Sequence, residues 1–211
     1  MFQDRMDAGL QLADNLQQFK DKNVVVLAIP RGGLPLGAIV AQSLHAPLDV
    51  ALSKKIGHPY NKEYAIGAVS LDDRILSDLP NIDKTYISRE TEIIRQKLRK
   101  RYDQYYRNSS PLDLMGKTVI ILDDGVATGN TIKITAQMVH KKRPEKVIVA
   151  IPVAPTRAVE NMKSSNYIDE VICLETPYNF HAVGQFYNEF NEVTDEVAIQ
   201  LLEKTRKAYK S

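Results

Sequence analysis

Two adjacent carboxylates, Asp123 and Asp124, stand between an apolar run and a loop of small residues. The run at residues 119–122 is wholly aliphatic and predicts a strand that is buried on both faces. The loop at residues 125–129 leads into a predicted helix at residues 130–142. In an open parallel sheet, ligands bind beyond the carboxyl ends of the strands. The acids and the loop therefore predict a ligand site.

The residue types around the acids indicate what this site would bind. Backbone amides at a helix N-terminus, with the hydroxyls of Thr128 and Thr131, suit a phosphate group. The two carboxylates would repel a phosphate, so we expect them to accept hydrogen bonds from a donor such as a pair of ribose hydroxyls. Together these groups describe a ribose 5-phosphate. The purely structural alternative is an Asp-Gly turn capped by Asn130 or Thr128.

A second candidate anion site follows the first predicted strand. The apolar residues 24–29 run into Pro30, Arg31, Gly32 and Gly33. Two glycines let the backbone present its amides to a ligand, and the arginine supplies a fork of donors for phosphate oxygens. The glycine spacing does not match a dinucleotide fingerprint, and no acid ends the next strand to hold a ribose. We therefore predict a phosphate contact here and not a dinucleotide site.

A third candidate contact lies in the polar stretch at residues 53–63, which we predict to be a loop. It follows a predicted strand at residues 48–52 and carries Lys54 and Lys55. Two lysines in a loop usually form a solvated surface. Their place at the end of a parallel strand, beside the Arg31 turn, favours a role in anion binding instead.

The elements that must position these residues indicate an α/β protein. Residues 24–52 read as strand, loop, helix and strand, which is a βαβ unit with a parallel sheet. The complete set of expected elements follows from the hydrophobic periodicity. Strands are predicted at residues 24–29, 48–52, 66–70, 74–76, 119–122, 146–151 and 170–174, and helices at residues 5–19, 34–44, 85–107, 130–142, 156–163 and 194–209.

The predicted fold is an open, mostly parallel twisted sheet flanked by helices. We expect one domain over residues 1–211, with a core at about residues 22–175. The N- and C-terminal segments, at about residues 1–20 and 176–211, would form a small cap. A hairpin is expected around residues 72–73, between the two short strands.

Composition limits the possible classes of protein. The chain has 211 residues, 44% hydrophobic and 26% charged, as is ordinary for a globular protein. A net charge of +2 gives no argument for nucleic acid or membrane attraction. The single cysteine, Cys173, excludes an internal disulfide and a multi-cysteine metal site, and we expect it to pack in a core strand. The acidic, interrupted N-terminus does not read as a signal peptide, so the expected location is the cytoplasm.

Residues 118–131 resemble the phosphoribosyl pyrophosphate (PRPP) motif of the type I phosphoribosyltransferases. Four apolar residues, two acids and a small-residue loop ending in T-G-x-T occur in the family's order. One departure is Gly125, where an aliphatic residue is common in the family. Residues 2–13, 30–33, 55–69 and 182–196 resemble one subfamily of predicted bacterial and archaeal phosphoribosyltransferases whose acceptors are unassigned. The likeness covers nearly the whole chain.

The resemblance implies that an acceptor, such as a nucleobase, displaces pyrophosphate from C1 of PRPP with the help of Mg²⁺. Asp123, Asp124 and Lys55 would be the catalytic residues. Pyrophosphate would contact Arg31, Gly32, Gly33, Lys54 and Lys55, and the ribose and 5′-phosphate would contact Asp123, Asp124, Gly125, Val126, Ala127, Thr128, Gly129, Asn130 and Thr131.

The resemblance assigns no certain protein ligand to the Mg²⁺ ion, which would be held mainly by substrate and water. It also implies a homodimer that acts on a small molecule, with no membrane partner. Hypoxanthine–guanine enzymes carry an acid at the position that Ala127 occupies here. A 6-oxopurine acceptor bound in that manner is therefore not favoured.

Two alternatives stay open. The same fold could serve a non-catalytic regulator that binds PRPP or a nucleotide, and that binds RNA through basic residues at positions 89–107. We interpret that stretch as a hydrated helix face instead, because acids interleave with its bases. A relative of PRPP synthetase is less favoured, because the chain is short for the duplicated domains of that enzyme.

Overall fold

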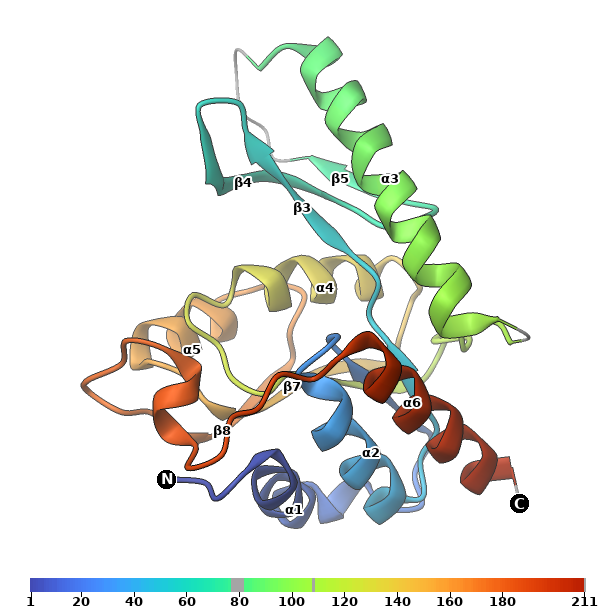
Figure 1. Cartoon of the computed structure of the whole chain (residues 1–211), viewed down its shortest axis with the longest axis vertical. Coiled ribbons are helices and arrows are strands. Elements are labelled where there is room, and N and C mark those ends of the chain that lie inside the picture. Colours follow the sequence, from blue (N-terminus) through green and yellow to red (C-terminus); the bar gives the residue numbers. More distant parts are fainter. Residues whose placement is uncertain (77–81, 108, 211) are drawn as a thin grey trace. The chain divides into compact units, whose positions relative to one another are not determined.

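The computed structural model describes residues 1–76, 82–107 and 109–210 (Figure 1). The chain forms two compact units. The first unit comprises residues 1–51 and 111–211, and the second comprises residues 52–110. Each unit has its own sheet and its own helices.

The first unit is built on a five-stranded parallel sheet with the order β2-β1-β6-β7-β8. In chain order this is a 2-1-3-4-5 arrangement, so the winding direction reverses between β1 and β6. Doubly wound sheets bind ligands at such a reversal. The strands are β1 (Val24–Ala28), β2 (Leu48–Val50), β6 (Thr118–Leu122), β7 (Lys146–Val153) and β8 (Glu170–Glu175). The predicted parallel sheet is confirmed.

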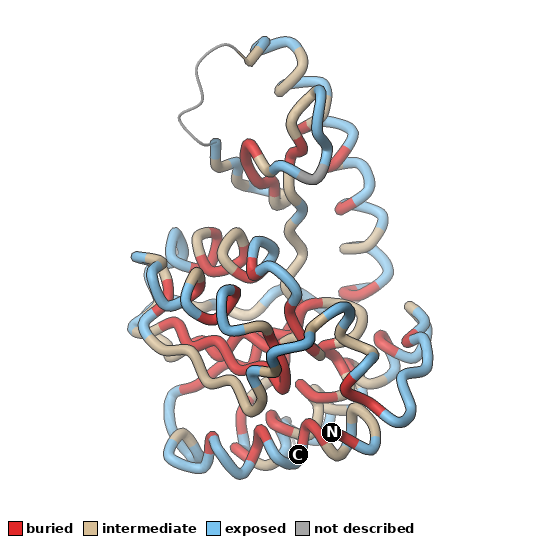
Figure 2. Tube along the Cα trace, turned by 90° about the vertical axis from the view of Figure 1, so that its left-hand side faces the viewer, coloured by how far each residue is buried: buried red, intermediate tan, exposed pale blue. Residues whose placement is uncertain are grey.

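Helices cover both faces of this sheet (Figure 1). The helices α1 (Arg5–Asn15) and α2 (Gly33–Leu44) pack against one face. The helices α4 (Asn130–His140) and α5 (Thr156–Lys163) form a hydrophobic core with the other face. This double cover explains the apolar runs of the sequence, and β1 is buried at every position. Figure 2 shows buried residues gathered in the interior and exposed residues on the outside.

The C-terminal helix, α6 (Asp195–Lys210), packs against α2 and β2. It carries Arg206, whose Nη2 donates to Oδ1 of the buried Asp49 at 2.5 Å. The other carboxylate oxygen of Asp49 accepts from the backbone N–H of Leu112 at 2.7 Å. This paired and hydrogen-bonded carboxylate ties α6 to the sheet. Two short 3₁₀ helices, η1 (Gln17–Phe19) and η2 (Val183–Phe186), complete the unit.

The second unit is an antiparallel sheet with the order β3-β4-β5, packed against one long helix. Its elements are β3 (Lys54–His58), β4 (Asn61–Val69), β5 (Arg74–Leu76) and α3 (Lys84–Tyr106). The prediction of a loop at residues 53–63 is wrong, because a hairpin of β3 and β4 occupies it. Ile56 is the one aliphatic residue in β3, and it is buried against α3, so burial and pairing create a strand that periodicity alone does not indicate. The predicted hairpin of β4 and β5 is confirmed.

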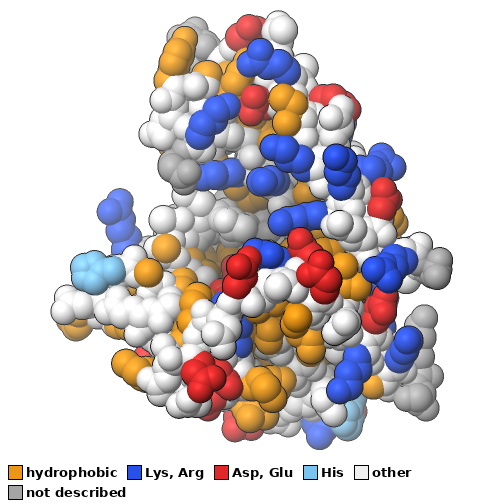
Figure 3. Space-filling view, in the orientation of Figure 1, with side chains coloured by type: hydrophobic (Ala, Val, Ile, Leu, Met, Phe, Trp, Pro, Cys, Tyr) orange, Lys and Arg blue, Asp and Glu red, His pale blue; other side chains and the backbone are white. Residues whose placement is uncertain are grey.

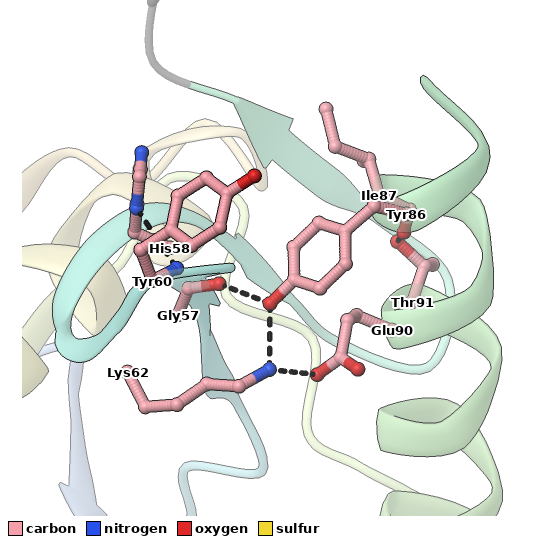
Figure 4. Close-up of polar contacts among 8 residues, drawn as sticks. All are labelled: Gly57, His58, Tyr60, Lys62, Tyr86, Ile87, Glu90 and Thr91. Carbon is pink, nitrogen blue, oxygen red and sulfur yellow. Dashed lines mark hydrogen bonds and ion pairs between the residues drawn. The ribbon is translucent and has the colours of Figure 1, made fainter. Parts of the chain in front are cut away.

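A hydrogen-bonded cluster joins the β3–β4 hairpin to α3 (Figure 4). The hydroxyl of Tyr86 donates to the carbonyl of Gly57 at 2.7 Å and accepts from Nζ of Lys62 at 2.6 Å. The same ammonium group donates to a Glu90 carboxylate oxygen at 3.2 Å. The hydrogen bond to Tyr86 is the main cause that raises the pKa of Lys62, with Glu90 adding to it. The cluster therefore fixes the position of the hairpin against the helix.

The basic stretch on α3 is largely exposed, as predicted for a hydrated face. Arg99 and Lys100 are exposed, and the acids Glu92 and Asp103 on the same helix are exposed too. Figure 3 shows Lys and Arg side chains on the second unit with Asp and Glu side chains among them. The mixture of signs weakens the attraction of this surface for a polyanion.

Most predicted element bounds agree with the structure. The helix at residues 156–163 is confirmed, whereas the one from residue 130 ends at His140 and not at residue 142. Cys173 lies half-buried on the edge strand β8, and burial raises its pKa to about 11. None of the helices described here has the length and apolar character to cross a membrane. The prediction of a single domain over residues 1–211 stays a prediction. Within the chain, residues 52–110 form one compact unit and the remaining residues form the other.

Candidate functional site

The acid pair and the Arg31 turn meet where β1 and β6 end. The backbone N–H of Ile29, just after β1, donates to the carbonyl of Leu122 at 2.8 Å. A Cβ atom on Gly32 would overlap the carboxylate of Asp124, and one on Gly33 would come within 2.8 Å of the Leu122 carbonyl. The glycines are therefore required because the turn lies directly against the acid pair. This is the point at which the sheet reverses its winding.

The two acids differ in their surroundings although they are neighbours in sequence. Asp123 accepts a hydrogen bond at Oδ1 from the backbone N–H of Asp124 at 2.9 Å. Burial, followed by the adjacent negative charge of Asp124, raises the pKa of Asp123 well above its ordinary value. The positive charge of Arg5 acts in the opposite direction. The pair thus combines one carboxyl that is easily protonated with one that has a cation at its side.

Arg5 is the cation beside Asp124, and the sequence reasoning assigned it no role. Its Nε and Nη2 atoms both lie 2.8 Å from Oδ2 of Asp124, and the two side chains are only 12% and 14% exposed. Its Nη1 atom donates to the carbonyl of Asn191 at 2.6 Å. Its Cζ atom lies 3.8 Å from the centroid of the Phe190 ring. Arg5 therefore connects the start of α1, the acid pair and the C-terminal segment.

Tyr187 supports the acid pair from the same segment. Its hydroxyl donates to the backbone carbonyl of Asp124 at 2.6 Å, and burial raises its pKa far above the ordinary value. Its ring contacts those of Phe2 and Phe190, with centroid separations of 5.4 and 4.9 Å. Like Arg5, these residues lie in stretches of the sequence that resemble the subfamily.

Gly125, the departure from the common family pattern, has a structural reason. Its φ is +155°, and an added Cβ would overlap a methyl group of Val183 and approach Val153 at 3.1 Å. An aliphatic residue at this position would therefore need both another backbone conformation and more space. The side chain of Val183, from η2, fills the volume instead.

The predicted phosphate loop leads into α4 as expected. Gly129 begins the helix with a φ of +80°, and the first turn carries the exposed side chains of Asn130 and Thr131. The first amides of a helix have no intrahelical acceptor, so they can face an anion. The loop is tied to α5 because Asn161 Nδ2 donates to the carbonyl of Thr128 at 3.3 Å. Residues 127, 128, 130 and 131 are thus exposed, while the loop is anchored to α5.

Arg31 and the two lysines are placed differently. Nη2 of Arg31 lies 2.6 Å from Oε1 of Glu192, with the two side chains 33% and 73% exposed. An exposed ion pair of this kind contributes about 1 kcal/mol or less, so an anionic ligand could replace the glutamate. Lys54 and Lys55 lie on β3 in the second unit. Their predicted contact with pyrophosphate stays a prediction.

The described part of the chain has no cluster of three or more histidine, cysteine or carboxylate side chains that could hold a metal ion. The oxygens of Asp123 and Asp124 are chemically suitable for Mg²⁺, which prefers oxygen ligands and retains water. The remaining ligands of such an ion would have to come from a substrate and from water.

Comparison with known proteins is consistent with this geometry. A family model described as the phosphoribosyl transferase domain matches residues 6–190. The chain is 38% identical, over 215 aligned residues, to a protein from two strains of Mycobacterium tuberculosis, whose name as a phosphoribosyl transferase is provisional. The alignment covers 99% of this chain and 48% of the mycobacterial protein. The chain thus spans about half the length of the curated relatives it matches.

Solved structures show the same fold. The crystal structure of TT1426 from Thermus thermophilus has a TM-score of 0.89 and 39% identity, and the match covers 96% of this chain and 98% of that one. A hypothetical protein from Neisseria gonorrhoeae, solved with bound ppGpp, has a TM-score of 0.52 and 14% identity, with 98% and 99% covered. That second likeness shows the fold alone. Because the family model covers residues 6–190, the chain belongs to the phosphoribosyl transferase family.

Proposed function

We propose that the protein is a PRPP-dependent phosphoribosyltransferase. The observation that carries the proposal is the convergence of Asp123 and Asp124 with the Gly32–Gly33 backbone at the reversal point of the sheet. A ribose diol needs hydrogen-bond acceptors, and a pyrophosphate needs backbone amides and cations. The turn and the acid pair supply both next to each other, while the exposed start of α4 supplies a place for the 5′-phosphate.

The reaction breaks the bond between C1 of the ribose and a pyrophosphate oxygen, and it forms a bond from C1 to the acceptor. In this proposal Asp123 and Asp124 accept hydrogen bonds from the ribose hydroxyls. Arg31, Lys54 and Lys55 neutralise the departing pyrophosphate, and the amides of residues 125–131 hold the 5′-phosphate. The protein accelerates the step by positioning the donor and stabilising developing charge. Mg²⁺, when bound, would shield the pyrophosphate charge.

The proposed acceptor is a small molecule, and a nucleobase is the expected class, which would yield a nucleoside 5′-monophosphate. Ala127, exposed in the loop, offers no carboxylate to a purine, so hypoxanthine and guanine are not the expected bases. The proposal includes a homodimer, which light scattering on the purified protein would test.

The test is pyrophosphate release from PRPP and Mg²⁺ with a panel of bases and amines. We expect turnover with at least one acceptor, and a loss of at least about 100-fold in the Lys55→Ala variant, since one charge on a leaving group is worth roughly 3 kcal/mol. Lys100→Ala is the matched control, because Lys100 is an exposed lysine of the same unit that lies on α3, outside the hairpin. Tight PRPP binding without turnover on any acceptor would favour the non-catalytic regulator.

A further inference from the structure

The N-terminal and C-terminal stretches that resemble the subfamily have no role in the proposed chemistry, yet they meet at one place. Phe2 packs on Tyr187, and Arg5 stacks on Phe190. The side chain of Asp4 caps α1 by accepting from the amides of Met6 and Asp7, at 2.7 and 2.8 Å. This cap fixes the first turn of α1, and therefore the position of Arg5. The two ends of the chain thus form one support for the acid pair.

The support is specific to Asp124. Two guanidinium nitrogens of Arg5 lie 2.8 Å from the same oxygen, Oδ2. The backbone carbonyl of Asp124 accepts from Tyr187, so the residue is held at its side chain and at its main chain. Gly32 lies against the same carboxylate, since a Cβ atom added there would overlap Oδ2. A carboxylate held in this way presents its remaining lone pairs in one fixed direction.

The arginine itself has little freedom. Its third nitrogen donates to the carbonyl of Asn191 at 2.6 Å, and its Cζ atom lies over the Phe190 ring. Arg5 is 12% exposed, so solvent screens its charge only in part. A lysine could supply the charge, but it could not make the same planar contact with the ring and the same fork of donors.

We propose that Arg5 is a positioning residue for ribose recognition: it fixes the Asp124 carboxylate that accepts the ribose hydroxyls and thereby sets the preference for a ribose over a 2-deoxyribose phosphate. This inference rests on the proposed function, because it assumes that the acid pair faces a sugar. It adds a residue 119 positions from Asp124 in sequence to that site. Arg5 need not touch the sugar, since it acts through Asp124.

The test compares two sugars that share a phosphate group. Calorimetric titration of the whole protein with ribose 5-phosphate, 2-deoxyribose 5-phosphate and inorganic phosphate gives three affinities for each variant. In the wild type we expect ribose 5-phosphate to bind about tenfold more tightly than the deoxy sugar. A ratio of this size corresponds to one good hydrogen bond to a charged group. In Arg5→Gln the ratio of the two affinities should fall to near one. A mere loss of positive charge would weaken all three ligands equally and would leave the ratio unchanged.

Two further variants keep the test valid if Arg5→Gln does not fold. Arg5→Lys should retain part of the preference, and Phe190→Leu, which leaves the ion pair but removes the ring, should retain more of it. Arg143→Gln is the matched control. It removes one charge from an exposed turn just before β7, at the end of the strands that lies opposite to the acid pair. We expect wild-type affinities and a wild-type ratio from this control.

The outcomes separate this inference from the proposed function. A wild type that binds neither sugar phosphate nor PRPP would refute the proposed function. A wild type that binds both sugars equally, or an Arg5→Gln or Arg5→Lys variant that keeps the full preference, would overturn the inference alone. Tighter binding of ribose 5-phosphate by Arg5→Gln would also overturn it, because Arg5 would then be a competitor for Asp124 and not its support.

Discussion

The close approach of Gly32 to Asp124 allows a test with a single methyl group. The Gly32→Ala substitution would place a Cβ atom on the Asp124 carboxylate, so either the turn or the acid must move. We expect PRPP to bind at least about tenfold more weakly, which corresponds to about 1.4 kcal/mol. Isothermal titration with PRPP measures the change.

Gly116→Ala is the matched control for this methyl group. Gly116 has a φ of +64°, and an added Cβ would have no neighbour within 4 Å. It precedes β6, at the end of the strand opposite to the acid pair. Its substitution should cost about 1 kcal/mol of stability through backbone strain and should leave PRPP affinity unchanged. Unchanged PRPP binding by Gly32→Ala would contradict the proposed role of the turn.

The unequal surroundings of the two acids predict opposite effects on stability. The folded protein raises the pKa of Asp123 above its ordinary value of 3.8, chiefly by burial. Between the ordinary and the raised pKa the folded state binds more protons than the unfolded state, so stability is lost as the pH rises through this range. Asp123→Asn removes that loss, and we expect a higher free energy of unfolding than the wild type at neutral pH. Near pH 3.8 and below, this gain should disappear.

Asp124→Asn should instead destabilise the protein. It leaves the guanidinium of Arg5 without its carboxylate in a site that is only 12% exposed, at a cost on the order of 3 kcal/mol. Urea unfolding of both variants and the wild type, across acidic to neutral pH, measures these differences. Equal destabilisation by both substitutions would show that the two acids do not differ in the way described. Both variants should lose affinity for ribose 5-phosphate.

The start of α4 favours a negative charge through the helix dipole, and in the proposed function it also binds a 5′-phosphate. One substitution can separate these two effects. Thr131→Asp places a negative charge in the first turn, where the helix dipole stabilises it by about 0.5 kcal/mol. The same charge would repel a 5′-phosphate. We therefore expect an unchanged or slightly higher melting temperature, together with a loss of ribose 5-phosphate binding of at least about tenfold.

Gln137→Glu adds the same charge farther along α4 and serves as the control. We expect phosphate binding close to that of the wild type. Salt screens the charge at residue 137 from a phosphate that is bound at the first turn of the helix. Melting curves and titrations on the two variants give both quantities. Retained ribose 5-phosphate binding in Thr131→Asp would place the phosphate elsewhere.

For the whole molecule, the second unit is an insertion whose ends meet. Residues 49 and 112 flank it, and the amide of Leu112 donates to the carboxylate of Asp49 at 2.7 Å. The first unit has its own core and its own complete sheet. We expect that replacing residues 52–110 with a short Gly-Ser linker leaves a protein that unfolds in one cooperative transition and still binds ribose 5-phosphate.

The shortened protein would lack Lys54 and Lys55, so its affinity for pyrophosphate should fall much more than its affinity for ribose 5-phosphate. Circular dichroism during heating and parallel titrations with the two ligands measure both. The double variant Lys54→Ala, Lys55→Ala in the whole protein is the control, since it removes the charges and keeps the unit. Failure of the shortened protein to fold would show that the first unit depends on the second.

The sequence alone determined the parallel sheet, the acid pair at the end of β6 and the small-residue loop before α4. These features could be predicted because each is local: an aliphatic run, a change of residue type and a helix start lie within about fifteen neighbouring positions. The resemblance to the family also indicated the donor without any knowledge of contacts. The β3–β4 hairpin was missed because its strand pattern depends on burial against α3.

Only the tertiary structure decided how the two acids differ. Arg5 contacts Asp124 across 119 positions, and Tyr187 contacts it across 63, so no local pattern could connect them. Periodicity likewise did not show that Val183 fills the space beside Gly125. Burial and ion pairing depend on which distant segments the chain brings together, and these two effects set the charge and the orientation of the carboxylates.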